Sequence, residues 1–217
     1  MSLTLDALKI DVNDVAKKIV NGIKEYMANI GINRAVVGVS GGVDSATTLT
    51  LTTRALGSEN VTALIMPDPI ATPKEDIEDA RSLAKMLGVK VEYVEIGDIF
   101  KAYAKSMPIF NPNAVKANGN LKARIRMCLL YYYANINNAL VIGSSDKSEL
   151  LIGYFTKYGD GGVDILPIGD LYKTQVRQLA VGLGVPEKIA YKPSSPRLWP
   201  GHMAEDELGL SYSEIDL

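Results

Sequence analysis

The chain has 217 residues, of which 47% are hydrophobic, with 23 lysines and arginines against 25 aspartates and glutamates. This length suits one α/β domain, and a net charge of −2 argues against a large nucleic-acid-binding surface. No apolar run approaches the roughly 18 residues of a membrane span, and the N-terminus lacks the pattern of a secretion signal. The single cysteine, Cys128, excludes an intramolecular disulfide and fits a cytoplasmic location.

Short apolar runs alternate with segments of helical periodicity along the chain. The runs predict strands at Ala35–Val39, Val61–Met66, Val89–Ile96 and Ala139–Gly143. The segments between and after them predict helices at residues 12–30, 46–55, 73–87, 98–105, 121–136 and 171–183. Strands that alternate with helices indicate an α/β fold, a mostly parallel, Rossmann-like sheet with helices on both faces.

Local sequence chemistry predicts two of the boundaries between these elements. Thr72 is followed by Pro73 and Glu75, which favours a helix capped by Thr72. The segment Pro108–Asn120 is rich in proline, glycine and asparagine, so we expect a mobile loop there.

The segment Ser40–Ser45, with the sequence SGGVDS, joins the first predicted strand to a helix. Free backbone N–H groups and the helix dipole make such a turn an anion site, and glycines let the backbone approach a phosphate closely. Asp44 would repel phosphates unless a cation lies between them, so it is interpreted as a Mg²⁺ ligand. The alternative is an ordinary strand–helix turn with serine and aspartate caps.

A second acidic segment, residues 143–149 (GSSDKSE), follows the fourth predicted strand. The carboxyl ends of parallel strands meet at one edge of a sheet, so Glu149 could share a metal ion with Asp44. Asp146 and Glu149 also have the spacing of a capping box, and that pattern alone does not decide between cap and ligand.

Other polar residues allow weaker interpretations. Arg124 lies in a basic stretch with Lys122 and Arg126, for which a solvated helix face is the simpler explanation. Lys173 has the pattern of a surface lysine, and the lone His202 has no ligand partner nearby and is assigned no role.

Several motifs together resemble ammonia-dependent NAD synthetases, members of the N-type ATP-pyrophosphatase (PP-loop) family. They are SGGVDS (40–45), GNLKARIRM (119–127), KSELLIGYFTKYGDGGVDILPI (147–168), LYKTQVRQLA (171–180) and DELGLSYSEID (206–216). The resemblance covers most of the chain and implies a single NAD synthetase domain over 1–217 with an adenine nucleotide alpha hydrolase-like fold. It implies a ligase that uses ATP, Mg²⁺ and ammonia to convert nicotinic acid adenine dinucleotide (deamido-NAD) into NAD, AMP and pyrophosphate.

The resemblance also assigns roles to residues. Asp44 and Glu149 would bind the metal, and Asp44, Ser45 and Lys173 are the catalytic candidates. Deamido-NAD would contact Arg124, Lys157 and Asp164. The implied ATP contacts are Gly38, Ser40, Gly41, Gly42, Val43, Asp44, Ser45, Ser144, Lys173 and Ser194. The family continues beyond the position of Leu217 into a segment with a His-Lys pair, for which this sequence has no counterpart.

Four further expectations concern assembly, dynamics and specificity. Within the helix at 121–136, the run Met127–Ala134 is apolar or aromatic all round, which predicts that the helix is buried on every side and pairs two chains in a homodimer. Residues 191–205 contain three prolines and are expected to form a mobile lid. Cys128 is expected to be buried and unreactive, so free ammonia is the expected nitrogen donor, with a separate glutaminase subunit as the alternative source. Alternatives are a GMP-forming or tRNA-thiolating ATP-pyrophosphatase, or a non-catalytic nucleotide sensor.

Overall fold

The computed structural model describes residues 4–217. Its centre is a four-stranded parallel sheet in the order β3-β2-β1-β4, made of β1 (Arg34–Gly38), β2 (Val61–Ile65), β3 (Lys90–Tyr93) and β4 (Ala139–Ile142). In the register, Val36 of β1 pairs with Thr62 of β2 and with Val141 of β4. The predicted parallel sheet is therefore confirmed, and each predicted strand overlaps an observed one.

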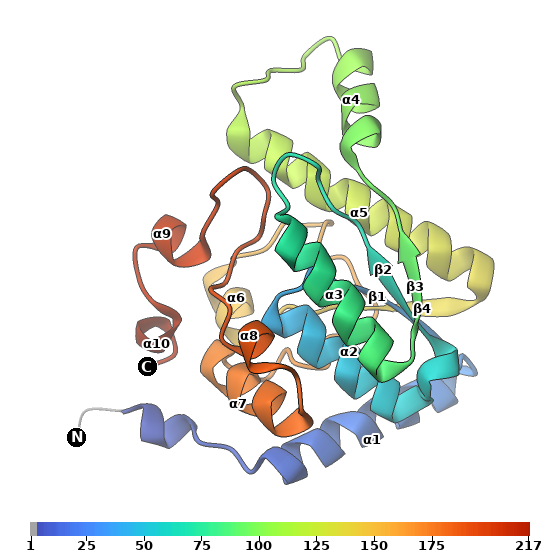
Figure 1. The fold of residues 1–217 in the computed structure, drawn as a ribbon, viewed down its shortest axis with the longest axis vertical. Coiled ribbons are helices and arrows are strands. Elements are labelled where there is room, and N and C mark those ends of the chain that lie inside the picture. The colour runs from blue at the N-terminus through green and yellow to red at the C-terminus, as the bar shows by residue number, and fades with distance from the viewer. Residues whose placement is uncertain (1–3) are drawn as a thin grey trace.

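Helices cover both faces of the sheet (Figure 1). One face carries α1 (Val12–Ile30), α2 (Val43–Leu56), α3 (Lys74–Leu87), α7 (Lys173–Leu183) and α8 (Glu187–Ala190). The other face carries α4 (Gly97–Ser106) and α5 (Val115–Asn137). Shorter elements are η1 (Leu5–Leu8), η2 (Ser58–Asn60), α6 (Lys147–Ile152), α9 (Ala204–Leu208) and α10 (Tyr212–Ile215). Within residues 4–217, no helix has the length and hydropathy needed to span a bilayer.

The central strand β1 divides its side chains between two apolar cores. Val37 packs in the core shared with α2, whereas Val36 packs in the core shared with α5, and both are fully buried. Burial on both faces explains why the strand reads as a continuous apolar run rather than as an alternating one. The carboxyl ends of β1 and β4, which are neighbours in the sheet, deliver residues 40–45 and 143–149 to one edge.

Helix α5 begins at Val115 rather than at the predicted Leu121, so the expected loop over Pro108–Asn120 is wrong for its second half. Gly119 lies inside the helix and faces the C-terminal part of the chain. A Cβ on this residue would lie 3.0 Å from the Cβ of Leu198. The glycine therefore serves close packing between distant segments, and it does not interrupt the helix.

The predicted cap at Thr72 is also wrong, because Pro73 occupies the N-cap position of α3. The Thr72 hydroxyl instead accepts a hydrogen bond from the backbone N–H of Asp68 at 3.0 Å. The side chain closes the turn that follows β2, and proline at the cap position leaves the helix start without a side-chain acceptor.

One face of α5 is exposed in the single chain, and this is the face that a second chain would cover in the predicted homodimer. Tyr132 is 68% exposed and Ile136 is 64% exposed. Cys128 is exposed as well, so its expected burial is wrong. The sheet and α4 cover only part of the helix, and the apolar residues Cys128, Tyr132 and Ile136 remain on the surface of a single chain.

Candidate active site

The loop that follows β1 is held by its own two serines. The backbone N–H of Ser40 donates to Ser45 Oγ at 3.2 Å, and the N–H of Gly42 donates to Ser40 Oγ at 3.3 Å. Gly42 is the N-cap of α2, and no side chain caps the helix. The first-turn N–H groups of a helix lack helical partners and lie at the positive end of its dipole. The loop therefore has the geometry of the predicted anion site.

Gly41 is required by its backbone conformation and by a neighbouring helix. Its φ is +83°, and an added Cβ would lie 2.2 Å from the carbonyl oxygen of Asp76 in α3. Gly42 has more room, since the nearest atom to an added Cβ is Ser40 Oγ at 3.5 Å. Close approach of α3, rather than of a phosphate, thus explains the first glycine of the pair.

The amino group of Lys173 lies among three carboxylates at the same edge of the sheet. Its Nζ contacts Oδ2 of Asp44 at 2.6 Å, Oδ2 of Asp146 at 2.9 Å and Oε1 of Glu149 at 2.9 Å. The side chain is fully buried, and its Nζ also lies 4.8 Å from the ring centre of Tyr212. The interpretation of Lys173 as a surface lysine is therefore wrong.

The electrostatics of this cluster follow from its burial. Burial raises the pKa of Glu149 and of Asp146 above their ordinary values, although the attraction of Lys173 opposes the change. For Lys173, burial acts to lower the pKa, but Asp44 and the other carboxylates outweigh it and raise the pKa well above the ordinary value. The cluster thus has three carboxyl groups and one amine, and a further cation would favour the ionised form of the carboxyl groups whose pKa is raised.

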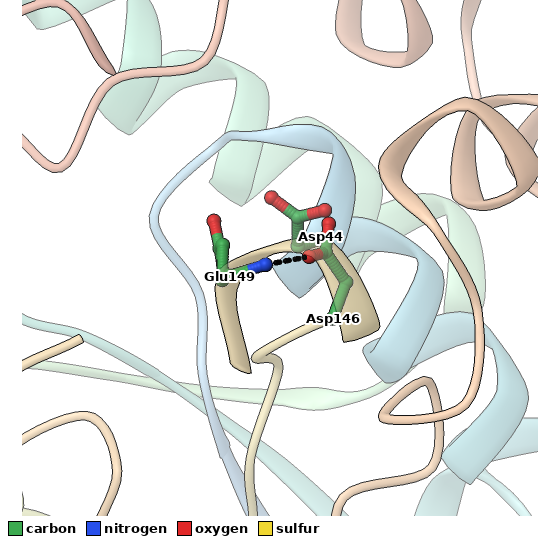
Figure 2. Close-up of side chains that lie close together, drawn as sticks. All are labelled: Asp44, Asp146 and Glu149. Carbon is green, nitrogen blue, oxygen red and sulfur yellow. Dashed lines mark hydrogen bonds between the residues drawn. The ribbon is translucent and has the colours of Figure 1, made fainter. Parts of the chain in front are cut away.

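Figure 2 shows how the three carboxylates converge from two elements, with Asp44 on α2 and the other two at the start of α6. Oδ1 of Asp146 accepts the backbone N–H of Glu149 at 2.9 Å, so Asp146 does cap α6. The Glu149 side chain does not complete a capping box but turns to Lys173. One oxygen from each carboxylate lies within 4.8 Å of those of the others.

The donor set of this cluster fits Mg²⁺. Carboxylate oxygens are the ligands that Mg²⁺ prefers. The buried Oδ1 of Asp44 has no hydrogen-bond partner among residues 4–217. An unpaired buried oxygen is costly unless a ligand completes it. Asp44 and Glu149 therefore have the chemistry expected of metal ligands.

A cavity of about 410 Å³ opens beside the loop and the carboxylate cluster. Its lining includes seven candidates from the sequence, namely Gly38, Ser40, Asp44, Ser45, Ser144, Glu149 and Ser194. Its apolar wall includes Leu64, Met66 and Leu130, and residues 194–199 form a further side. The cavity is large enough for a small organic ligand, and its lining combines polar and apolar groups.

Comparison with known proteins identifies the family. The model of the NAD synthase family matches residues 15–217. The chain belongs to the NAD synthase family. A relative from Staphylothermus marinus, described as an NH3-dependent NAD+ synthetase, is 57% identical over 212 residues, which are 98% of this chain and 77% of the relative. A relative of the same description from Hyperthermus butylicus is 56% identical over 218 residues, or 100% of this chain and 78% of the relative.

Solved structures from the NAD synthase family share the fold. The NMN synthetase from Francisella tularensis superimposes with a TM-score of 0.90 and 38% identity, covering 96% of this chain and 85% of that one. The NH3-dependent NAD synthetase from Campylobacter jejuni superimposes with a TM-score of 0.78 and 42% identity, covering 84% of this chain and 78% of that one. A glutamine-dependent NAD+ synthetase from Acinetobacter baumannii superimposes with a TM-score of 0.80 and 32% identity, covering 93% of this chain but 38% of that one. These matches confirm the predicted α/β fold class.

The three residues predicted to bind the dinucleotide lie outside the cavity lining of this family member. Arg124 Nε donates to the carbonyl oxygen of Lys157 at 3.2 Å, so these two are neighbours on the surface. Asp164 accepts the hydroxyl of Tyr131 at 2.9 Å and the backbone N–H of Val141 at 2.8 Å. The structure thus brings Arg124 to Lys157, while Asp164 is held at the end of β4.

Two other basic residues of α5 are not the solvated face that the sequence favoured. Lys122 Nζ lies 2.5 Å from Asp68 Oδ2 and donates to the carbonyl oxygen of Leu198 at 3.1 Å. Arg126 Nε donates to the carbonyl oxygen of Met66 at 2.9 Å. Both side chains tie the segment after β2 to the walls of the cavity.

His202 is buried in a cluster of side chains that sequence reasoning missed. Its ring stacks on Trp199 with 3.4 Å between ring centres, and its Nε2 lies 2.8 Å from Glu207 Oε2 and 3.2 Å from the Tyr154 hydroxyl. All four side chains line the cavity. Trp199, His202 and Glu207 are close in sequence, but only the fold brings them to Tyr154.

Proposed function

We propose that this chain amidates deamido-NAD with ammonia at the expense of ATP, forming NAD, AMP and pyrophosphate. The observation that carries the proposal is the meeting of Ser40–Ser45 with the cluster around Lys173 at one end of the cavity. Relatives that are 52–57% identical are described as NH3-dependent NAD+ synthetases, which supports the choice of reaction.

The chemistry requires activation of a carboxylate. The nicotinate carboxylate is a poor acceptor for ammonia, because the leaving group would be oxide. One carboxylate oxygen attacks the α-phosphorus of ATP, the bond to the β-phosphate oxygen breaks, and an acyl adenylate forms. Ammonia then attacks the acyl carbon, and AMP leaves with the oxygen that came from the carboxylate.

The residues of the loop and the cluster have separate tasks in this scheme. The backbone of the Ser40–Ser45 loop binds ATP phosphates, with Ser144 and Ser194 as further contacts. Lys173 supplies positive charge where charge accumulates on the departing pyrophosphate. Asp44 and Glu149 would hold Mg²⁺, which when bound neutralises charge on phosphate oxygens.

Arg124, Lys157 and Asp164 are proposed to bind deamido-NAD. They lie on the surface next to the exposed face of α5 that carries Cys128 and Tyr132. A homodimer formed through that face would enclose this surface, because a second chain would cover the exposed apolar side chains. Dimerisation would therefore complete the substrate site.

Residues 191–205 are proposed to close over the bound substrates and keep water from the acyl adenylate. The segment already forms part of the cavity wall through Ser194, Arg197 and Trp199. Opening would let ATP and the dinucleotide enter.

Free ammonia is the proposed nitrogen donor. The relatives described as NH3-dependent NAD+ synthetases are 52–57% identical to this chain, whereas the glutamine-dependent enzyme from Acinetobacter baumannii is 32% identical. Cys128 is exposed but lies away from the cavity lining, so it is not placed to serve the reaction there.

A second acceptor is favoured by one observation. The NMN synthetase from Francisella tularensis superimposes over 96% of this chain with a TM-score of 0.90. The corresponding mononucleotide acid, which would yield NMN, carries the same nicotinate carboxylate. It is therefore the competing substrate to test beside deamido-NAD.

The proposal is tested by product analysis with purified protein, ATP, Mg²⁺ and either acid as acceptor, with ammonium or glutamine as nitrogen source. We expect NAD and AMP in equal amounts with deamido-NAD and ammonium, and the same rate in the control variant Cys128→Ala. If the mononucleotide acid is converted faster than deamido-NAD, it replaces deamido-NAD as the proposed acceptor. ATP binding without AMP formation would indicate a nucleotide sensor, and glutamine-driven synthesis that is lost in Cys128→Ala would overturn the ammonia assignment.

A further inference from the structure

A second, smaller cavity of about 50 Å³ lies on the outer side of the phosphate-binding loop. One side is formed by Ser40, Gly42 and Asp44 of the loop, and the other by Lys192, Ser194 and Arg197 of the segment after α8. Two basic side chains from a distant part of the chain thus face the N-terminus of α2. Neither was singled out by the sequence motifs.

Buried carboxylates of α3 hold both basic side chains in place. Lys192 Nζ contacts Asp76 Oδ1 at 2.9 Å and also pairs with Asp79, and its side chain is 12% exposed. Arg197 Nε donates to Asp76 Oδ2 at 2.8 Å. This is the only hydrogen bond of the guanidinium group within residues 4–217, so its two terminal nitrogens remain available to a ligand.

The charges that line this cavity are balanced, with the carboxylates of Asp44 and Asp76 beside the cations of Lys192 and Arg197. Asp76 and Asp79 are nearly fully buried, and alone they would repel phosphates from the loop. Lys192 pairs with both of them, Lys188 pairs with Asp79 and Arg197 pairs with Asp76, so their negative charge is neutralised. Burial acts to raise the pKa of Asp79, but its bonds to Lys188 and Lys192 outweigh this and lower the pKa, so the carboxylate stays charged.

The backbone at Arg197 supplies a separate observation. Its φ is +51°, and it is one of three non-glycine residues with positive φ within residues 4–217. A side chain with a Cβ adopts this conformation at some energetic cost, and such residues gather at ligand sites. Here the conformation coincides with the anchoring of the guanidinium on Asp76 at the edge of the loop.

We propose that Arg197, anchored by Asp76 and flanked by Lys192, binds the pyrophosphate end of ATP and the pyrophosphate product in this second cavity. A guanidinium group held through Nε presents its remaining nitrogens as a fork, which matches two phosphate oxygens. Asp76 is then a positioning residue, because its ion pair with Arg197 orients the guanidinium group toward the phosphate oxygens. The inference rests on the proposed function, because that function supplies ATP as the ligand.

The test measures binding of pyrophosphate, with and without Mg²⁺, and separately of adenosine. Trp199 is the only tryptophan and lies two residues beyond Arg197, so its fluorescence reports on this segment, and calorimetry provides an independent value. The variants are Arg197→Gln and Arg197→Lys. Arg81→Gln is the matched control, since Arg81 is an exposed arginine of α3 that stacks on Tyr93.

For Arg197→Gln we expect pyrophosphate affinity to fall about tenfold to a hundredfold, the loss typical of a charge-assisted hydrogen-bonding pair, while adenosine affinity stays unchanged. The pyrophosphate affinity of Arg197→Lys should lie between those of wild type and Arg197→Gln, and that of Arg81→Gln should equal that of wild type. Unchanged pyrophosphate affinity in Arg197→Gln would overturn the inference. An equal loss for pyrophosphate and adenosine would also overturn it, because a clamp that merely holds the segment would affect both ligands.

This experiment requires no turnover. If wild type binds pyrophosphate through Arg197 but forms no NAD, the proposed function fails while the anion site stands. If NAD forms and Arg197→Gln binds pyrophosphate normally, the inference alone fails.

Discussion

Lys173→Met removes the amino group that contacts the buried carboxylate of Asp146 and the partly buried carboxylates of Asp44 and Glu149, and it keeps an apolar stem of similar length. Breaking a buried ion pair by removing one partner costs about 3–5 kcal/mol, because the remaining charges stay buried without compensation. Lys173 contacts all three carboxylates within 2.9 Å, so the upper part of this range is expected when they are ionised.

The loss of stability should depend on pH with a defined sign. Burial raises the pKa of Asp146 and of Glu149 in the folded chain. A carboxyl group with a raised folded-state pKa destabilises the fold as the pH rises above its unfolded pKa of about 4, and the effect grows until the folded pKa is passed. Without Lys173 these values rise further, so the variant should lose less stability near about pH 6 than near about pH 8.5.

The assay is urea unfolding followed by circular dichroism, for wild type, Lys173→Met and the double variant Lys173→Met/Asp146→Asn. The double variant removes one carboxylate and should recover part of the loss. Mg²⁺ at a concentration of a hundred times its Kd adds about 2.7 kcal/mol to the free energy of unfolding. At one and the same Mg²⁺ concentration, Lys173→Met should gain more stability than wild type, because its cluster has lost a competing cation. A loss below about 1 kcal/mol at high pH, or a loss independent of pH, would refute this account of the cluster.

Three further predictions test the metal ligands, the assembly and the lid. Asp44→Asn should slow NAD formation by at least about 10²-fold in steady-state kinetics with the fold intact; near-normal rates in both Asp44→Asn and Glu149→Gln would contradict the metal assignment. Tyr132→Glu should convert a dimer into a monomer in light scattering at micromolar concentration, because it places a charge on the apolar face of α5; a monomeric wild type would count against the dimer. Trypsin should cut free protein after Arg197, and ATP, deamido-NAD and Mg²⁺ should together suppress the cut; equal rates with and without ligands would reject the lid.

The core of the site could be predicted from the sequence because parallel strands impose a simple geometry. Residues 40–45 and 143–149 each follow a strand, and the carboxyl ends of neighbouring parallel strands lie at one edge. Strand order therefore predicts that Asp44 and Glu149 lie close together, but only the structure shows that the Glu149 side chain turns to Lys173 and does not complete a capping box. The positions of the strands could also be predicted, because strands that are buried on both faces are continuously apolar in sequence.

The remaining residues depend on contacts between distant segments. Lys173 lies 129 positions from Asp44, and nothing in its own helix distinguishes it from a surface lysine. Arg197 is anchored by Asp76, 121 positions away. The start of α5 was missed for the same reason, because Gly119 has the local character of a loop residue and its packing partner is Leu198.

The central claim is that the carboxylate of the acceptor attacks the α-phosphate of ATP at this site, and oxygen labelling tests it most directly. Deamido-NAD labelled with ¹⁸O in its nicotinate carboxylate is converted with ATP, Mg²⁺ and ammonium, and the products are analysed by mass spectrometry. The account predicts that each AMP formed carries one labelled oxygen and that pyrophosphate carries none. Unlabelled AMP, or label in inorganic phosphate released together with ADP, would contradict it.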